Sequence, residues 1–212
     1  MRPDSKKLPC MDQENSLARE AGGPVCGIDE AGRGPWAGPV VAAAVIFEGA
    51  APSGLNDSKK LSRSARERLY DEILARGKVG IGLSDCGEID EINILRATFA
   101  AMARALGALP VAPAAALVDG NRAPPLPCPA RTLVGGDALS ASIAAASIIA
   151  KVTRDRLMGE LARECPGYGW ERNMGYGTAE HRAGLERLGV TRHHRASFAP
   201  IRALLANLTA RA

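Results

Sequence analysis

The stretch from Cys26 to Pro35 constrains the chain most, because two adjacent acids follow a short apolar run and precede a Gly-Arg-Gly-Pro turn. Side chains on a regular strand alternate between its two faces, so Asp29 and Glu30 cannot share a face while the strand stays straight. A strand that ends near Asp29 and turns through glycines would bring Glu30 back toward the same point. This pattern indicates a metal site beside a loop that a polymer can approach. For this stretch alone, a strand followed by an ordinary acidic turn is the favoured interpretation, because adjacent acids before a glycine turn are common.

The length and composition of the chain favour one domain with a loose start. Its 212 residues are 46% apolar, which is enough to bury a sizeable core. Residues 1–23 are polar and mixed in charge, without the apolar segment of a secretory signal. We therefore expect a flexible N-terminal tail over residues 1–23 and one folded domain over residues 24–212.

Two further observations bear on where the protein works. The most apolar window, residues 97–118, holds Arg104 and two prolines, which argues against a membrane span. The five cysteines are widely scattered and show neither zinc-ligand nor redox spacing, so we expect free thiols in a reducing compartment. We therefore expect a cytoplasmic protein with no membrane partner.

Basic residues are concentrated toward the C-terminus. From Lys151 onward the chain holds 11 Lys or Arg against 6 Asp or Glu, and all three histidines lie there too. The first 150 residues hold 16 basic and 17 acidic groups. A basic part beside an acidic centre suits an anionic polymer held around metal ions, although a solvated basic helix surface gives the same count.

Hydrophobic patterning predicts strands interleaved with helices. Residues 39–47 form a β-rich run that we expect to pair with residues 25–29 as a hairpin. A helix carrying Leu69 and Ile73 is expected after a serine cap, with Ser62 and Ser64 as the candidates. Further strands are expected at 79–83, 115–118 and 131–134, and further helices at 88–106 and about 137–163.

Four carboxylates stand at strand ends or strand-to-helix junctions, and they are Asp29, Glu30, Asp119 and Asp137. In an open α/β sheet the chemistry collects at strand ends. Crowded carboxylates repel each other unless divalent cations neutralise them, and oxygen-only ligands favour Mg²⁺ or Mn²⁺ over zinc. Two such ions form the usual clamp for in-line attack on a phosphodiester. For Asp137 the alternative is a helix N-cap.

A pair of lysines lies in the loop before the first of the expected helices. Lys59 and Lys60 belong to the segment Asn56–Ser62, where two ammonium groups can hold a phosphate. Two exposed lysines without a ligand are an equally good explanation of this pair.

Several motifs together resemble the type 2 ribonuclease H family (ribonuclease HII). In chain order they are residues 29–35, 56–62, 119–122 and 142–155, then Gly175-Tyr176 with Thr178 and His181, and His193-His194-Arg195 with Ser197-Phe198. The matches run from about residue 25 to about residue 200, which is essentially the whole folded chain. Taken together, they are highly specific.

The resemblance implies a ribonuclease-H-like α/β fold, in which a mixed five-stranded sheet is flanked by helices and followed by a helical C-terminal extension from about residue 165. It also implies a metal-dependent endonuclease. Such an enzyme hydrolyses the RNA strand of RNA–DNA hybrids and cuts at single ribonucleotides embedded in duplex DNA, leaving 5′-phosphate and 3′-hydroxyl ends. Two divalent ions, Mn²⁺ or Mg²⁺, would be bound together with the substrate.

The resemblance also assigns roles to individual residues. The catalytic metal ligands would be Asp29, Glu30 and Asp119, with Asp137 as the fourth acid. The turn formed by Gly32, Arg33 and Gly34 would read the ribose 2′-OH, and Tyr176 would stack on the sugar of the following deoxynucleotide. The remaining residues expected to bind substrate are Lys59, Lys60, Ser147, Lys151 and Arg195.

The chain departs from the family pattern at two places. Many members have Lys where this chain has Gly135, and His-Lys where it has Asn173-Met174, so possible contacts to the nucleic-acid backbone are lost. The clamp-binding motif of archaeal and eukaryotic relatives is not evident in residues 201–212. We therefore expect a monomer whose partners are hybrid and ribonucleotide-containing duplexes, without a sliding clamp.

Two other functions stay open at this point. Another nuclease of the same fold, such as a junction resolvase, would share the acids but lack the Gly-Arg-Gly turn and Tyr176. A duplex-binding module without catalysis would not be expected to retain four clustered carboxylates. Cleavage of a DNA duplex with one ribonucleotide, compared with the all-DNA duplex, distinguishes these functions.

Overall fold

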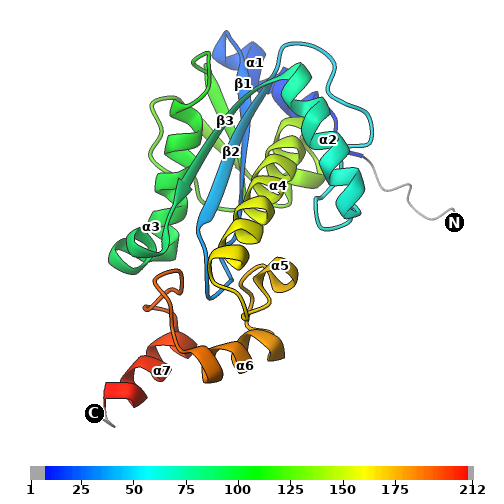
Figure 1. The fold of residues 1–212 in the computed structure, drawn as a ribbon. Coiled ribbons are helices and arrows are strands. Elements are labelled where there is room, and N and C mark those ends of the chain that lie inside the picture. The colour runs from blue at the N-terminus through cyan, green and yellow to red at the C-terminus, as the bar shows by residue number, and fades with distance from the viewer. Residues whose placement is uncertain (1–7, 210–212) are drawn as a thin grey trace, which may run out of the picture.

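A mixed five-stranded sheet forms the centre of the computed structural model, which describes residues 8–209 (Figure 1). Its strands follow the spatial order β3-β2-β1-β4-β5. Their bounds are Val25–Ala31 for β1, Val40–Phe47 for β2, Gly77–Ser84 for β3, Ala115–Asp119 for β4 and Ala130–Leu133 for β5. The five strands expected from the sequence are therefore confirmed.

Strand pairing determines where the acids lie. β1 pairs antiparallel with β2, which confirms the expected hairpin, and parallel with β4. The parallel register sets Ile28 beside Val118, so the next residues, Asp29 and Asp119, lie at the same level of the sheet. Two acids from distant parts of the sequence thus meet at one edge of the sheet, as parallel strand ends do.

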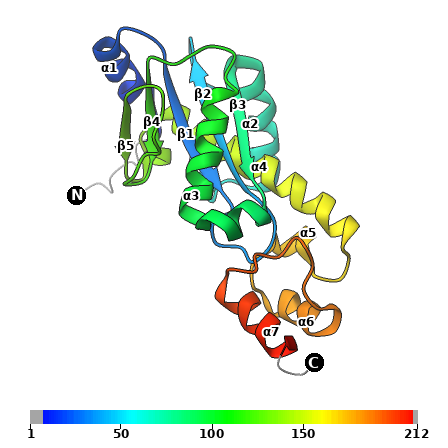
Figure 2. The same ribbon diagram turned by 90° about the vertical axis from the view of Figure 1, so that its left-hand side faces the viewer.

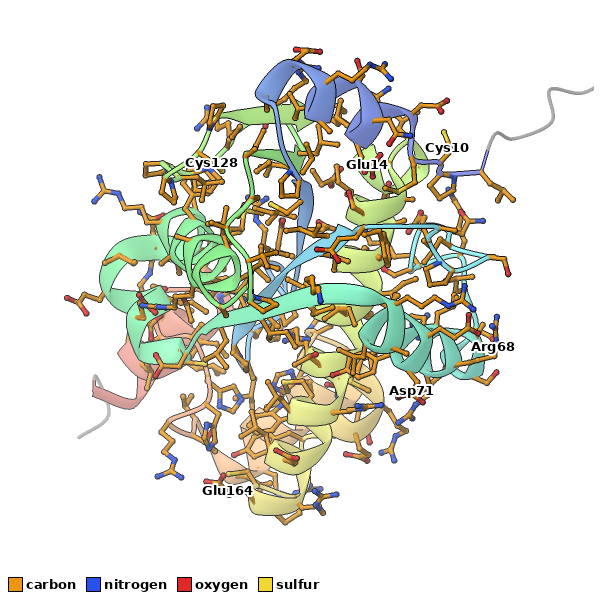
Figure 3. All side chains as sticks on the ribbon, turned by 90° about the horizontal axis from the view of Figure 1, so that it is seen from above. Cys10, Glu14, Arg68, Asp71, Cys128 and Glu164 are labelled. Atoms are coloured by element: carbon orange, nitrogen blue, oxygen red, sulfur yellow. The ribbon has the colours of Figure 1, made fainter. Side chains whose placement is uncertain are left out.

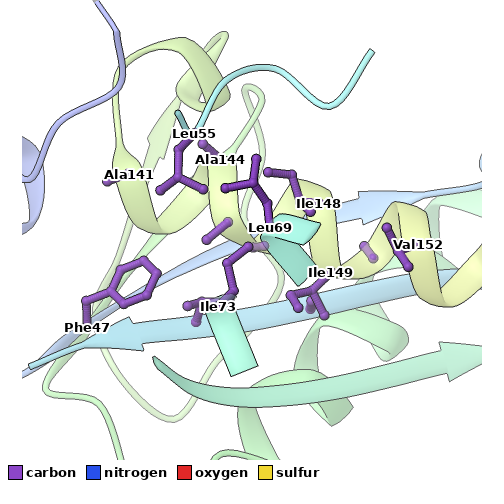
Figure 4. Close-up of a cluster of buried hydrophobic side chains, with 14 of the residues drawn as sticks. Phe47, Leu55, Leu69, Ile73, Ala141, Ala144, Ile148, Ile149 and Val152 are labelled. Carbon is purple, nitrogen blue, oxygen red and sulfur yellow. The ribbon is translucent and has the colours of Figure 1, made fainter. Parts of the chain in front are cut away.

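Helices cover both faces of the sheet (Figures 1 and 2). Alternate residues of β2 divide between two cores: Val41 and Val45 pack with α2 and α4, whereas Ala44 and Ile46 pack with α3. Figure 4 shows the first core, between β2 and the two helices. The helices are α1 Asp12–Ala21, α2 Arg63–Arg76, α3 Cys86–Gly107, α4 Ala141–Glu164, α5 Trp170–Asn173, α6 Ala179–Leu188 and α7 Ala199–Thr209, with a 3₁₀ turn η1 at Gly136–Ala138.

Helix α4 lies directly against β1. A Cβ atom on Gly27 would be 2.3 Å from the backbone nitrogen of Ile143, so only glycine permits this approach. The helix begins after Ser140, whose Oγ accepts a hydrogen bond from the Ile143 backbone N–H at 3.1 Å. Asp137 lies in η1 instead, with no capping hydrogen bond of its own to α4. The alternative of Asp137 as a helix cap is therefore wrong.

The N-terminal segment differs from the expected flexible tail. Residues 12–21 form α1, which packs on β1 and β4 through the buried Leu17. Glu14, labelled in Figure 3, is also buried. It accepts hydrogen bonds from Ser140 Oγ at 2.6 Å and from the Ser142 backbone N–H at 2.8 Å. These bonds tie α1 to the start of α4, so the prediction of a loose tail is wrong for residues 12–21. Residues 1–7 lie outside the described part.

The C-terminal segment forms a helical group beyond one end of the sheet, next to the end of α4 (Figures 1 and 2). Its own apolar cluster includes Trp170, Leu185 and Ile201, packed against Ala37 and Met158. The group is thereby anchored to the β1–β2 loop. In the part of the chain that the structure describes, no helix is both long enough and apolar enough to cross a membrane.

Candidate active site

A cavity of about 410 Å³ opens at the carboxyl ends of β1 and β4. All four predicted acids line it, together with the Gly-Arg-Gly turn and Tyr176. The full lining is Asp29, Glu30, Ala31, Gly32, Arg33, Gly34, Ser58, Lys59, Asp119, Asp137, Ser147, Lys151, Arg154 and Tyr176. The structure therefore brings together segments from the start, the middle and the end of the chain.

Asp29 is the most deeply buried of the four acids, with 7% of its surface exposed. It points to the α4 side of β1, and its Oδ1 accepts a hydrogen bond from the Glu30 backbone N–H at 2.7 Å. Burial raises the pKa of Asp29 well above its ordinary value, and the neighbouring charges of Glu30 and Asp119 raise it further. The carboxylate form of Asp29 thus lacks a compensating positive charge.

Glu30 reaches the cavity from the other face of the sheet. β1 continues to Ala31, so the chain does not turn back after Asp29 as the sequence suggested. Glu30 lines both this cavity and a second hollow on the α3 side, and Arg33 Nη1 pairs with its Oε1 at 3.2 Å. Burial raises the pKa of Glu30, and the Arg33 charge partly opposes that shift.

Asp119 and Asp137 are held close together by a backbone contact. Asp119 Oδ1 accepts a hydrogen bond from the Gly136 backbone N–H at 2.7 Å, which ties the end of β4 to η1. Burial raises the pKa of Asp137, and the charges of Asp57 and Asp119 contribute to the rise. Asp137 is therefore part of the acidic cluster, as predicted by position.

The donor set of the cavity fits a hard divalent cation. Its four acids offer only oxygen ligands, and burial and mutual repulsion make at least three of them poor at holding their charge unaided. Within residues 8–209, only one group of three potential metal ligands has all its donor atoms within 4.8 Å of one another. This group is Glu164, Cys165 and His193, and it lies away from the cavity. The four acids thus surround a space instead of converging on one point.

Two buried arginines support the β1–β2 loop that contains the Gly-Arg-Gly turn. Arg195 donates to the backbone oxygens of Gly32 at 2.6 Å, Arg33 at 2.9 Å and Gly38 at 2.8 Å. Arg154 donates to the backbone oxygens of Pro39, Met174 and Ala37 at 2.9 to 3.1 Å. Burial and the Arg154 charge lower the pKa of Arg195 to about 10, which leaves it charged at neutral pH. Both side chains therefore act on backbone carbonyls.

The structure contradicts one predicted substrate contact and separates another from the cavity. Arg195 has no exposed surface, so it cannot reach a phosphate, and it supports the turn instead. Lys60 is absent from the cavity lining and pairs with Asp57 at 3.3 Å. Lys59, Ser147 and Lys151 do line the cavity. Some basic residues of the motifs therefore hold the protein backbone in place, and others are candidates to contact the substrate.

Sequence reasoning missed two polar residues of the site. Ser58 is buried in the lining, and its Oγ lies 2.9 Å from Ser147 Oγ. Arg154 also lines the cavity and is 1% exposed. Both residues lie inside motifs that carry the family resemblance, and membership of these motifs is the sequence feature that could have identified them. Their burial depends on tertiary packing, which a motif does not reveal.

Comparison with known proteins agrees with this geometry. The family model described as Ribonuclease HII matches residues 26–201. A ribonuclease HII from Rhodospirillum rubrum is 60% identical over 198 residues, covering 90% of this chain and 91% of the relative. The crystal structure of ribonuclease H2 from Pyrococcus horikoshii superposes with a TM-score of 0.75 at 26% identity, covering 88% of this chain and 99% of that one.

A third comparison bears on the fold. Bst-RNase HIII, solved in complex with Mn²⁺, superposes with a TM-score of 0.66 at 20% identity, covering 89% of this chain and 71% of that chain. This likeness confirms the ribonuclease H fold. Because the matching family model covers most of the sequence and the bacterial relative is similar along nearly its whole length, the chain belongs to the ribonuclease HII family and is an endoribonuclease.

Proposed function

We propose that this enzyme uses two divalent ions, Mn²⁺ or Mg²⁺, to hydrolyse the RNA strand of RNA–DNA hybrids and to cut at single ribonucleotides in duplex DNA. The products would carry 5′-phosphate and 3′-hydroxyl ends. One observation carries the proposal: four carboxylates, the Gly-Arg-Gly turn and an exposed tyrosine line the same cavity. Metal chemistry and a group able to sense ribose are thereby adjacent.

The ligands in this proposal are Asp29, Glu30, Asp119 and Asp137. Two ions, when bound, activate a water molecule and stabilise the leaving oxygen of the phosphodiester. Burial raises the pKa of Asp29 and of Glu30, and bound cations would favour the charged form of both side chains. Lys59 and Lys151 lie at the same cavity and are suited to the backbone phosphates, as salt-dependent contacts.

Recognition of RNA rests on the turn before β2. A 2′-OH distinguishes ribose from deoxyribose, and peptide groups bond to it only at close range. Gly32 has a positive φ of 99°, and a Cβ there would lie 2.0 Å from Arg154 Nε, so its substitution would disturb the turn itself. A Cβ on Gly34 would meet only Tyr176 Cε1, at 3.5 Å. Gly34 is therefore the residue whose substitution tests access for the ribose.

Tyr176 would read the other side of the RNA-to-DNA step. Tyr176 is 48% exposed and lines the cavity, and the flat face of its ring suits a sugar that lacks the 2′-OH. The extra hydroxyl of a ribose would crowd the ring. Tyr176→Ala should therefore lower cleavage of a single embedded ribonucleotide more than cleavage of a long hybrid.

The decisive assay uses a DNA duplex containing one ribonucleotide, with the all-DNA duplex as its substrate control. We expect Mn²⁺- or Mg²⁺-dependent cleavage of the first duplex only, and loss of activity in a chelator. Gly34→Ala should fold normally and lose cleavage of every ribose-containing substrate. Cleavage of both duplexes alike would favour a nuclease without ribose recognition, such as a junction resolvase.

The partner proposed for the enzyme is nucleic acid alone. We propose a monomer. We also propose that it reaches its substrate without a sliding clamp, because residues 201–212 show no clamp-binding motif. Gel filtration of the enzyme with and without a duplex tests the stoichiometry, and a mass above one chain per duplex would contradict it.

A further inference from the structure

A chain of hydrogen bonds runs through two buried histidines and ends at the backbone of Tyr176. The Thr191 backbone N–H donates to His194 Nδ1 at 2.9 Å, and His194 Nε2 lies 3.0 Å from His181 Nε2. His181 Nδ1 lies 3.0 Å from the Tyr176 backbone oxygen. His181 has no exposed surface and His194 has 3%, so water does not replace these contacts.

The partners at the ends of this chain permit one arrangement of protons. A backbone N–H only donates, so His194 Nδ1 must accept, and a neutral His194 carries its proton on Nε2. A carbonyl oxygen only accepts, so His181 must carry its proton on Nδ1. The Trp170 indole N–H, which also only donates, points to His181 Nε2 at 3.1 Å and requires the same tautomer. The three contacts agree on these tautomers, and the His194 Nε2–H and the Trp170 N–H then share the single lone pair of His181 Nε2.

Hydrogen bonds hold the backbone near Tyr176 on both sides: Trp36 N–H donates to the Gly175 oxygen at 2.8 Å, and Arg154 Nη1 donates to the Met174 oxygen at 3.0 Å. Tyr176 stands between Gly175, with a φ of 80°, and Gly177, and Met174 before them also has a positive φ of 51°. A Cβ on Gly177 would lie 2.1 Å from the Trp36 ring, so this segment must stay free of side-chain bulk. Hydrogen bonds therefore position the segment: Tyr176 N–H donates to the Asn173 oxygen at 2.9 Å, and its own oxygen accepts from Thr178 and His181.

We propose that His181 and His194 are positioning residues for Tyr176, whose carbonyl they fix and whose ring they thereby hold at the mouth of the cavity. The inference rests on the proposed function in one respect, the substrate contact assigned to Tyr176. The histidines do not touch the substrate. They determine how well the enzyme distinguishes a single ribonucleotide from a long hybrid.

Two near-isosteric variants of His194 separate positioning from packing. The amide nitrogen of Gln reaches the place of Nε2, so His194→Gln keeps a donor to His181. Asn ends at the place of Nδ1, so His194→Asn keeps a partner for Thr191 and loses the donor to His181. His193→Gln is the matched control, because His193 points to Glu164 at 3.1 Å, outside the chain of bonds.

The measurement is kcat/KM on a single-ribonucleotide duplex divided by kcat/KM on a long hybrid. We expect His194→Asn to lower this ratio roughly three- to tenfold, the scale of one hydrogen bond, and His194→Gln and His193→Gln to leave it near the wild-type value. Equal ratios for all three, while Tyr176→Ala lowers the ratio, would overturn the inference. An unchanged ratio for Tyr176→Ala itself would instead contradict the proposed role of the tyrosine.

A second measurement needs no variant and no activity. Nitrogen-15 NMR of the full-length wild-type enzyme reports which ring nitrogen of each histidine carries the proton. We expect His194 protonated on Nε2 and His181 on Nδ1 at pH 7.5. Either histidine in the opposite tautomer would break the chain of bonds and refute the inference, even where His194→Asn fails to fold.

Discussion

The acidic cavity and the polar cluster behind it are both buried, yet their polar groups are satisfied to different degrees. In the cavity, Asp29 is paired with neighbours of its own charge, and its pKa is raised. The support cluster, which we define as Arg154, Arg195, His181 and His194, is different. Its hydrogen-bonding groups contact backbone carbonyls, a backbone N–H, the Trp170 indole N–H or one another. Buried polar groups that lack compensating partners in their own chain are suited to bind a ligand. Buried polar groups that have all their partners are suited to hold the binding site in place.

The largest expected effect comes from removing one negative charge from the acidic cavity. Asp119→Asn keeps the size of the side chain and weakens metal binding, so activity should fall by orders of magnitude. Stability should stay equal or rise, because repulsion from Asp29 is relieved. Single-turnover cleavage and thermal unfolding measure the two effects. Near-normal turnover at saturating Mg²⁺ would be incompatible with a ligand role for Asp119.

The support cluster should respond in the opposite way. Arg195→Met leaves the carbonyls of Gly32, Arg33 and Gly38 without their donor, and should lower the free energy of unfolding by about 3–5 kcal/mol. Urea unfolding measures this loss. A stable Arg195→Met variant with weakened duplex binding would instead indicate a phosphate contact and would reverse the assignment.

Acid should unfold the support cluster through His194. Burial and the nearby His181 lower its pKa in the folded protein to about 4, against 6.5 for the ordinary side chain. Between these values the unfolded chain binds the additional proton, so stability falls as the pH drops from 6.5 toward 4, by about 3 kcal/mol. Above pH 6.5 this contribution is constant. Unfolding at several pH values should show a shallower decline for His194→Gln, and an identical decline would contradict the shifted pKa.

The smallest expected effect distinguishes a candidate substrate contact from a support. Lys151 lines the cavity and pairs with Asp155 at 2.7 Å, so a phosphate would compete for its charge. Lys151→Ala should make the slope of log binding constant against log salt shallower by about one unit, with little change in stability. Fluorescence anisotropy with a labelled duplex measures the slope. A slope equal to that of the wild type would leave Lys151 as a surface residue.

The same contrast explains which features the sequence could predict. The strand positions follow from apolar runs, and the register of β1 with β4 then brings Asp29 and Asp119 together. The burial of Arg195 could not be predicted, because its acceptors are carbonyls of a loop more than 150 positions earlier in the chain. Helix α1 was missed for a similar reason: Glu14 makes the segment look polar, yet its carboxylate is bonded to Ser140 and Ser142. Partners distant in sequence decide the role of a charged residue.

Calorimetric titration of Mn²⁺ into the free enzyme tests most directly whether the acidic cavity is the region that needs a cation. We expect binding by the wild type and by His194→Gln, with protons released as the acids whose pKa is raised ionise. Binding by Asp29→Asn and Asp119→Asn should be strongly weakened. Unchanged Mn²⁺ binding by both Asn variants would contradict the account.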